Sequence, residues 1–181
     1  MDSIAVNSEA VASTFSRLSN PVWYVAYTCP RHEKRVAQQV VDRGMRSFLP
    51  IYRSIRRWKD RRKELELPLF PGYCFVQIAI EQRIDLLRVP GVIDLVTFQG
   101  KPAPISHTEM EALIRSDRVG GLQPHPYLKV GRKVRVQNGP MAGIEGIFVR
   151  RKDRVRIVIS VTLIQRAVVL EMDESDVEIV D

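Results

Sequence analysis

The sequence predicts an α+β protein with two domains and a linker between them. Over residues 21–118, strand and helix patterns alternate in the order β-α-β-β-α-β-α, which is typical of a split β-α-β antiparallel sheet with flanking helices. Residues 128–181 contain only short strand patterns separated by turn signals, which favours a small closed β-barrel. Between them, residues 119–127 hold two glycines, two prolines and no charged side chain, as expected of a linker.

The first domain opens with a strand and a helix. Residues 22–28, "VWYVAYT", are aromatic and β-branched, which favours a buried strand. In the following segment Pro30 suits a first helical position and Gly44 a C-terminal stop. The helix has one apolar stripe, formed by Val36, Ala37, Val40 and Val41, so we expect it to pack on the sheet. Residues 1–20 are polar and rich in small residues, and predict a flexible tail.

Strands and helices then alternate to the end of this domain. Residues 46–52 predict a second strand in which Pro50 implies an edge or a bulge. Ser106 followed by Glu109 predicts a helix with a capping box. The other expected elements are an extended hairpin or loop at 53–67, a strongly apolar strand at 73–80, a short helix at 81–91 and a strand at 92–98.

Composition limits the class of protein. The formal net charge is +7 and the pI about 9.7, which suggests an anionic partner. Residues 21–118 carry 17 Lys and Arg against 11 Asp and Glu, so 17 − 11 = +6 of that charge lies there. No apolar run approaches the roughly 18 residues that span a bilayer. Cys29 and Cys74 fit a reduced cytoplasmic protein, and the chain has no P-loop, dinucleotide loop, metal-ligand cluster or catalytic set, so we expect no enzyme, cofactor or metal.

Two motifs resemble those of a known family. In the second domain, "VGRKVRVQNGPMAGIEGIFVRR" is similar to the KOW motif, with Gly139, Gly143 and Gly146 at the expected positions. In the first domain, "WYVAYT", "FLP", "PLFPGYCFV" and "PAPIS" follow one another as in the N-terminal domain of NusG-type transcription elongation factors. The segments "YTCPRHEKRVAQQVVDRG" and "RRWKDRRK" resemble those of the specialised RfaH- and UpxY-like paralogues.

The resemblance implies a non-enzymatic, monomeric transcription elongation or antitermination factor with an SH3-like KOW barrel. Its N-terminal domain would bind the clamp helices of the largest RNA polymerase subunit and suppress pausing, and its KOW domain would recruit a ribosomal small-subunit protein or Rho. Resemblance to RfaH also implies a switch of the KOW domain to helices. The β-branched stretch "RVRIVISVTL" instead predicts a stable barrel. The alternative function is a KOW-type RNA-binding or ribosome-associated protein.

The resemblance places the polymerase-binding surface on aromatic side chains. These are Tyr73 and Phe75, with contributions from Phe98 and Phe70. Alternation along the strand puts Tyr73 and Phe75 on one face and Cys74 and Val76 on the other. One face is then core and the other an aromatic patch, whereas the competing interpretation is that both are ordinary core.

Cationic side chains are the candidates for nucleic-acid contact. Seven Lys and Arg side chains lie between Arg53 and Lys63. They either form a solvated hairpin tip or contact DNA phosphates or an acidic polymerase surface. Resemblance to the RfaH-like paralogues implies that the start of the first helix contacts the non-template DNA strand of the transcription bubble. The candidates are Arg31, His32, Lys34 and Arg35 at the start of the first helix, together with Arg56, Arg57 and Arg61 in the hairpin.

The KOW partner contact is expected in "SVTLIQRA". There Leu163 and Ile164 are either exposed apolar contacts or part of the barrel core. The family typically has an aromatic residue at the position of Ile164 and a glycine at that of Gln165, so this chain departs from the pattern at both.

Overall fold

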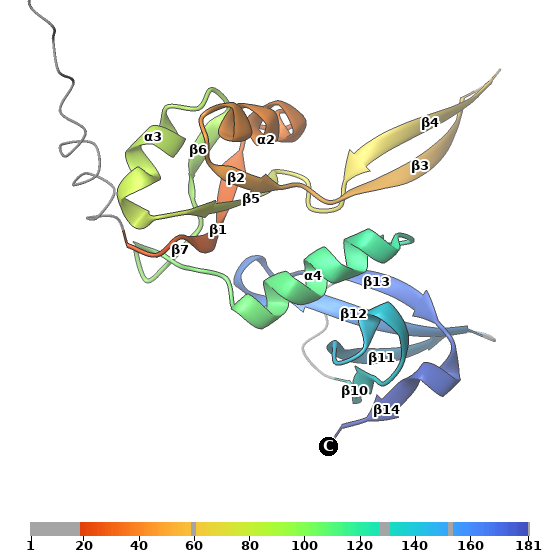
Figure 1. Cartoon of the computed structure of the whole chain (residues 1–181). Coiled ribbons are helices and arrows are strands. Elements are labelled where there is room, and N and C mark those ends of the chain that lie inside the picture. Colours follow the sequence, from red (N-terminus) through yellow and green to blue (C-terminus); the bar gives the residue numbers. More distant parts are fainter. Residues whose placement is uncertain (1–18, 59–60, 127–130, 152–153, 181) are drawn as a thin grey trace, which may run out of the picture.

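The computed structural model describes residues 19–58, 61–126, 131–151 and 154–180 (Figure 1). The tail expected at residues 1–20 lies, except for Ser19 and Asn20, outside the described residues. The chain has the predicted α+β fold, with a sheet and helices in its N-terminal part and an all-β C-terminal part. The domain limits at 21–118 and 128–181 stay a prediction.

A four-stranded antiparallel sheet forms the N-terminal part, with strand order β2-β5-β1-β6. The central pair is β1 (Val22–Thr28) and β5 (Tyr73–Ile78), whose register places Val25 opposite Phe75. The outer strands are β2 (Arg46–Phe48) and β6 (Val92–Leu95). Both central strands alternate between two faces, and each face is buried, because the two buried clusters of the core lie on opposite sides of this sheet.

Two helices cover one face of that sheet. Helix α2 (Glu33–Asp42) buries Val36 and Val40 completely, one turn apart, as its apolar stripe predicts. It ends two residues before Gly44, whose φ of +77° belongs to the left-handed region that favours glycine. The predicted helix at 81–91 is a short 3₁₀ turn, η1 (Ile80–Gln82), followed by α3 (Arg83–Leu87). Leu86 of α3 joins the same buried cluster as α2.

The stretch predicted as one strand at 46–52 is two strands. Pro50 lacks a backbone donor and separates β2 from β3 (Ile51–Trp58), while its carbonyl accepts from Leu69 N–H at 2.9 Å. Strand β3 pairs with β4 (Arg61–Pro68) from the pair Ile51–Pro68 to the pair Trp58–Arg61. The two form a separate two-stranded sheet that projects from the N-terminal part (Figure 1). The hairpin alternative for residues 53–67 is therefore confirmed.

The strand expected at 92–98 is likewise divided. It forms β6 and then β7 (Thr97–Phe98), which pairs with β8 (Lys101–Pro102). Helix α4 (His107–Val119) follows. Ser106 is its N-cap residue, but the predicted capping box is wrong, because the Ser106 side chain makes no capping hydrogen bond. The Glu109 carboxylate instead accepts hydrogen bonds from Thr162 in the C-terminal part.

The C-terminal part is a curled six-stranded antiparallel sheet, as the absence of a helical pattern predicted (Figure 1). Its strand order is β14-β10-β11-β12-β13-β9. The strands are β10 (Lys133–Val136), β11 (Glu145–Arg151), β12 (Arg154–Val161), β13 (Arg166–Met172) and β14 (Val177–Ile179), with 3₁₀ turns η2 (Gly139–Met141), η3 (Thr162–Ile164) and η4 (Glu174–Asp176). The β-branched segment at 154–163 is mainly strand β12, as predicted.

The stretch expected as a linker contributes a sixth strand to this sheet. Strand β9 (Gln123–His125) pairs with β13, and the preceding Leu122 is buried. Pro124 did not exclude a strand because β9 is the last strand of the sheet order, where pairing is needed on one side only.

Helix α4 contacts the C-terminal sheet directly. The Arg115 guanidinium donates to the carbonyls of Pro140 at 2.8 Å and Ala142 at 2.9 Å. One buried cluster contains Phe75 of the N-terminal sheet, Met110 and Leu113 of α4, and side chains of the C-terminal sheet. In this conformation the second face of the N-terminal sheet is therefore part of a core that both parts of the chain share.

Candidate functional site

The aromatic side chains of the "LFPGYCF" segment lie at two depths. Phe70 and Phe75 are buried and meet edge to face, with ring centroids 5.4 Å apart. Phe48 of β2 lies 6.1 Å from Phe75 on the same face of the sheet. Phe70 and Phe75 thus belong to the shared core in this conformation, which is the arrangement that ordinary core residues would have.

Tyr73 is the half-buried member of this group. Its ring contacts that of Tyr27, which stands opposite it in the register of β1 and β5, at a centroid distance of 5.6 Å. Tyr27 is 46% exposed. Phe98 is 66% exposed on β7 and is in none of the aromatic ring contacts of the described residues. The structure therefore brings Tyr73 together with Tyr27, a residue for which the sequence predicted no role.

A tight turn carries Tyr73. Gly72 adopts a φ of +84°, and its carbonyl accepts from Thr28 N–H at 2.8 Å. The N–H of Gly72 donates to Oε1 of Glu33, also at 2.8 Å. Glu33 lies at the first position of α2 and is only 5% exposed. A carboxylate is favoured there by the helix dipole as well.

Glu33 also lies close to the buried thiol of Cys74. Burial raises the pKa of Cys74 to about 12, and the nearby carboxyl of Glu33 contributes to the increase. Glu33 lies three residues before Val36 and seven before Val40, so it continues the buried face of its helix. Its hydrogen-bond partner is 39 residues away, so the sequence alone could not identify the contact. Two signals were present: a carboxylate on the buried face of the helix, and the "PGY" turn, whose glycine leaves a backbone donor that needs an acceptor.

The cationic candidates at the start of α2 all lie at the surface. Arg31 has a φ of +66°, which is uncommon for a residue other than glycine. His32 is the N-cap residue and makes no side-chain capping bond. Lys34 forms an ion pair with Glu66 of β4 at 3.1 Å, and Arg35 is exposed. Arg31, Lys34 and Arg35 thus surround a helix start whose first turn already carries the Glu33 carboxylate.

The projecting hairpin places its cationic positions away from the sheet (Figure 1). Lys34–Glu66 links its base to α2, and Arg53 pairs with Glu64 at 3.4 Å. Ile55 is 72% exposed. The backbones of Arg56, Arg57 and Arg61 belong to β3 and β4, and their side chains lie outside the described part of the structure.

Leu163 and Ile164 lie on η3 and are half-buried against the shared core. Thr162 at the start of this turn donates to Oε1 of Glu109 on α4, from its backbone N–H at 3.4 Å and its hydroxyl at 2.6 Å. Gln165 follows with a φ of +49°, in the left-handed region that residues other than glycine seldom adopt. The expected partner-contact turn is thus held against α4.

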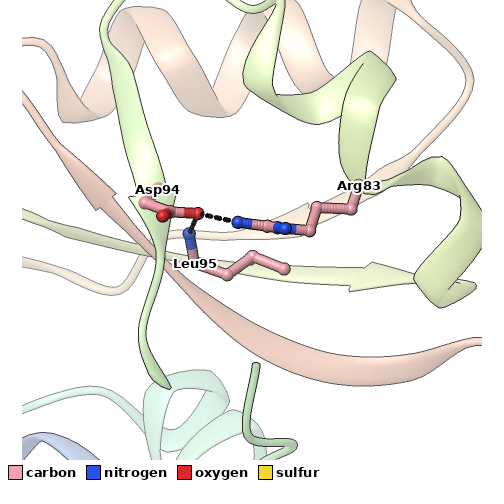
Figure 2. A network of polar contacts seen from close by, with 3 residues as sticks. All are labelled: Arg83, Asp94 and Leu95. Atoms are coloured by element: carbon pink, nitrogen blue, oxygen red, sulfur yellow. Dashed lines mark hydrogen bonds and ion pairs between the residues drawn. The ribbon is translucent and has the colours of Figure 1, made fainter. Parts of the chain in front are cut away.

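A polar contact joins α3 to β6, which pairs with β1 on the edge away from β5. Asp94, which stands opposite Tyr27 in the register, accepts from Arg83 Nη2 at 2.9 Å and from Leu95 N–H at 2.8 Å (Figure 2). The hydrogen bond from Arg83 is the main cause that lowers the pKa of Asp94. This network ties α3 to β6, the strand that pairs with β1.

The fold and these surfaces define a protein of two packed parts with aromatic and cationic surface groups. Among residues 19–58, 61–126, 131–151 and 154–180, no group of three or more His, Cys, Asp or Glu side chains is placed so that it could bind a metal ion. Over the same residues, no helix is both long and apolar enough to cross a membrane.

Comparison with known proteins gives the family. Residues 21–114 match the family model described as "Transcription termination factor nusG". The transcription termination/antitermination protein NusG of Escherichia coli (strain K12) is 30% identical over 171 residues, covering 86% of this chain and 94% of that protein. The corresponding protein of Pseudomonas aeruginosa is 29% identical over 173 residues, covering 86% and 97%. The chain belongs to the NusG family of transcription termination/antitermination factors, a non-enzymatic family.

A solved structure supports the fold independently. The structure of Thermotoga maritima NusG aligns with a TM-score of 0.55 and 22% sequence identity, covering 89% of this chain and 98% of that chain. At this identity the likeness bears on the fold alone. It agrees with the order found here, a sheet with helices followed by an all-β part.

Proposed function

We propose that this protein is a cytoplasmic elongation or antitermination factor that binds RNA polymerase through its N-terminal part. The dock is the aromatic surface around the β4–β5 turn, and its target is the pair of clamp helices of the largest polymerase subunit. Membership of the NusG family supports the general activity. The observation that carries the choice of surface is Tyr73, held half-buried in a tight turn against the exposed ring of Tyr27.

Tyr73 and Phe98 are accessible contributors in this proposal, whereas Phe70 and Phe75 shape the surface from beneath. An aromatic ring with one exposed side supplies a large contact area with few rotatable bonds, as is typical of interface anchors. Docking that includes the ring of Phe75 itself requires α4 and the C-terminal sheet to move away from the shared core.

We further propose that the cations beside this surface contact nucleic acid. Arg31 and His32 lie just before α2, and Lys34 and Arg35 lie in its first turn. Lys34 forms an ion pair with the base of the hairpin that carries Arg56, Arg57 and Arg61. Phosphate contacts from such residues give affinity without sequence information. The non-template DNA strand of the transcription bubble is the proposed ligand.

The C-terminal sheet is the proposed recruiting module, with Leu163 and Ile164 facing a ribosomal small-subunit protein or Rho. The hydrogen bonds between Thr162 and Glu109 keep their turn against α4, so recruitment follows the separation of these elements. Departures from the family at Ile164 and Gln165 favour the ribosomal protein over Rho.

We also propose that the chain is a specialised RfaH- or UpxY-like paralogue. The supporting residues are those of "YTCPRHEKRVAQQVVDRG" and the cation-rich hairpin. Its gene neighbourhood tests this directly. A polysaccharide cluster is expected, and a position among ribosomal-protein and secretion genes would identify the housekeeping factor instead.

The docking surface is tested by measuring the affinity of the full chain for bacterial core RNA polymerase. Tyr73→Ala is expected to weaken binding at least about tenfold, in the range of an interface hot spot. Ile84→Ala is the matched control, because Ile84 is also apolar and 64% exposed but lies on α3.

Equal affinity for Tyr73→Ala and wild type would contradict the proposed dock. A chain that ignores polymerase but binds structured RNA with steep salt dependence would support the alternative of a KOW-type RNA-binding protein.

A further inference from the structure

We propose that Glu33 is a positioning residue of the docking surface, which holds Gly72 so that the Tyr73 ring stays against Tyr27. The inference rests on the proposed function, in which Tyr73 contacts polymerase. Glu33 itself touches no partner in this account, since it is 5% exposed beneath the turn. Its action on docking passes through the backbone of the neighbouring turn.

Three hydrogen bonds fix the peptide groups on both sides of Gly72. Its N–H donates to Glu33 Oε1 at 2.8 Å, and its carbonyl accepts from Thr28 N–H at 2.8 Å. The next N–H, that of Tyr73, donates to the carbonyl of Phe70 at 3.1 Å. Two of these bonds come from backbone, and Glu33 provides the one that comes from a side chain. It is therefore the bond that a single substitution can remove.

The hydrogen bond to Glu33 holds a residue with unusual conformational freedom. Gly72 sits at φ +84°, a region that glycine enters and leaves easily because it has no Cβ. Without an acceptor for its N–H, the turn can exchange this conformation for others in which water takes the hydrogen bond. Tyr73 follows Gly72 immediately, so each such change redirects the start of β5 and the ring of Tyr73.

The position of the carboxylate argues for orientation as its main contribution. Burying a carboxylate is costly unless it is hydrogen-bonded, and an apolar side chain of similar size fills the same space without that cost. The surroundings are poorly hydrated, because the nearby Cys74 is completely buried and Glu33 itself is almost so. A side chain retained for packing alone needs no acceptor, whereas one that orients the Gly72 peptide does.

A pair of near-isosteric substitutions separates packing from the hydrogen bond. Glu33→Gln keeps a side-chain oxygen acceptor, and Glu33→Leu fills a similar volume without one. In the full chain we expect Glu33→Leu to melt within a few degrees of wild type. It should also exchange the Gly72 amide at least about tenfold faster and bind core RNA polymerase at least about fivefold more weakly. Glu33→Gln should stay within about twofold of wild type in both measurements.

Glu81→Leu is the matched control, because Glu81 is an exposed carboxylate on η1 that bonds Ser19. If folded Glu33→Leu binds polymerase with wild-type affinity while Tyr73→Ala binds more weakly, the positioning role of Glu33 would be contradicted. The proposed docking surface would remain supported. Unchanged polymerase affinity in Tyr73→Ala would refute the proposed docking surface. Amide exchange at Gly72 would still test whether Glu33 holds the turn. Should Glu33→Leu fail to fold, a Gly72 amide in wild type that exchanges like an unstructured glycine would overturn the inference.

Discussion

The β4–β5 turn and the β3–β4 hairpin are neighbours in the sequence but differ in how they are held. The turn is tied to β1 by Thr28 and to α2 by Glu33, and its flanking rings reach into the shared core. The hairpin is a separate two-stranded sheet whose described ion pairs, Lys34–Glu66 and Arg53–Glu64, are both solvent-exposed. The difference suggests a division of work, in which a fixed turn gives specific docking and a projecting hairpin gives electrostatic attraction that tolerates variation.

The largest expected contrast between the two regions is in stability. Phe75→Ala removes a fully buried ring from the shared core and should lower the free energy of unfolding by about 3–5 kcal/mol. Ile55→Ala on the hairpin, where the side chain is 72% exposed, should change it by less than about 0.5 kcal/mol. Urea unfolding of both variants gives the comparison, and similar losses would show that the hairpin packs as tightly as the turn.

The two cysteines provide a second contrast, between the core beneath the turn and the surface beside it. Cys74 is fully buried with a thiol pKa of about 12, so its reactive thiolate is scarce at pH 8. Cys29 is partly exposed. We expect a thiol reagent at pH 8 to label Cys29 at least about 100-fold faster, as judged by mass spectrometry of the native protein. Equal labelling rates would mean that the strand carrying Tyr73 opens readily.

The contribution of the hairpin is expected to appear in the salt dependence of the affinity for single-stranded DNA. If Arg57 and Arg61 each neutralise one phosphate, their replacement by Ala should reduce the slope of log affinity against log salt for single-stranded DNA by about 1.4, at roughly 0.7 per contact. Arg118→Ala with Arg132→Ala is a control of equal charge, in α4 and before β10. An unchanged slope in the hairpin variant would favour a solvated charge run.

The smallest effect is expected at Asp94, which joins β6 to α3 through Arg83 (Figure 2). Its pKa is lowered in the folded protein, chiefly by Arg83, so its stabilising contribution is present above the ordinary value of 3.8 and fades as the pH falls through the lower folded value. The pair is largely exposed, so Asp94→Asn should cost under about 1 kcal/mol at pH 7. The difference from wild type should shrink as the pH falls below 3.8, and a constant difference in unfolding experiments would point to a cause other than charge.

Local patterns sufficed for much of the fold. The stripe of Val36 and Val40 and the apolar alternation of β5 correctly gave a helix on a sheet, and the lack of helical period after residue 128 gave the all-β part. Expectations failed where a long-range partner decides. Glu109 turns to Thr162 instead of completing a capping box, and Gln123–His125 becomes a strand because β13 offers it an edge.

The candidate site divides in the same way. Tyr73 was accessible to sequence reasoning through its motif, and its half-buried state leaves it available for contact. The contact of Tyr73 with Tyr27 and the bond of Gly72 to Glu33 were not, because both depend on how β1, α2 and the turn meet in space. The burial of Phe70 and Phe75 likewise depends on α4 and the C-terminal sheet, which lie far along the chain.

The central claim is that the β4–β5 turn is the polymerase dock. Hydrogen–deuterium exchange of the full chain, with and without core RNA polymerase, tests it most directly. We predict that polymerase slows exchange most at residues 70–73 and in the facing end of β1 around Tyr27, with smaller changes in the C-terminal sheet. Protection confined to the hairpin or to η3, with the turn unchanged, would contradict the claim.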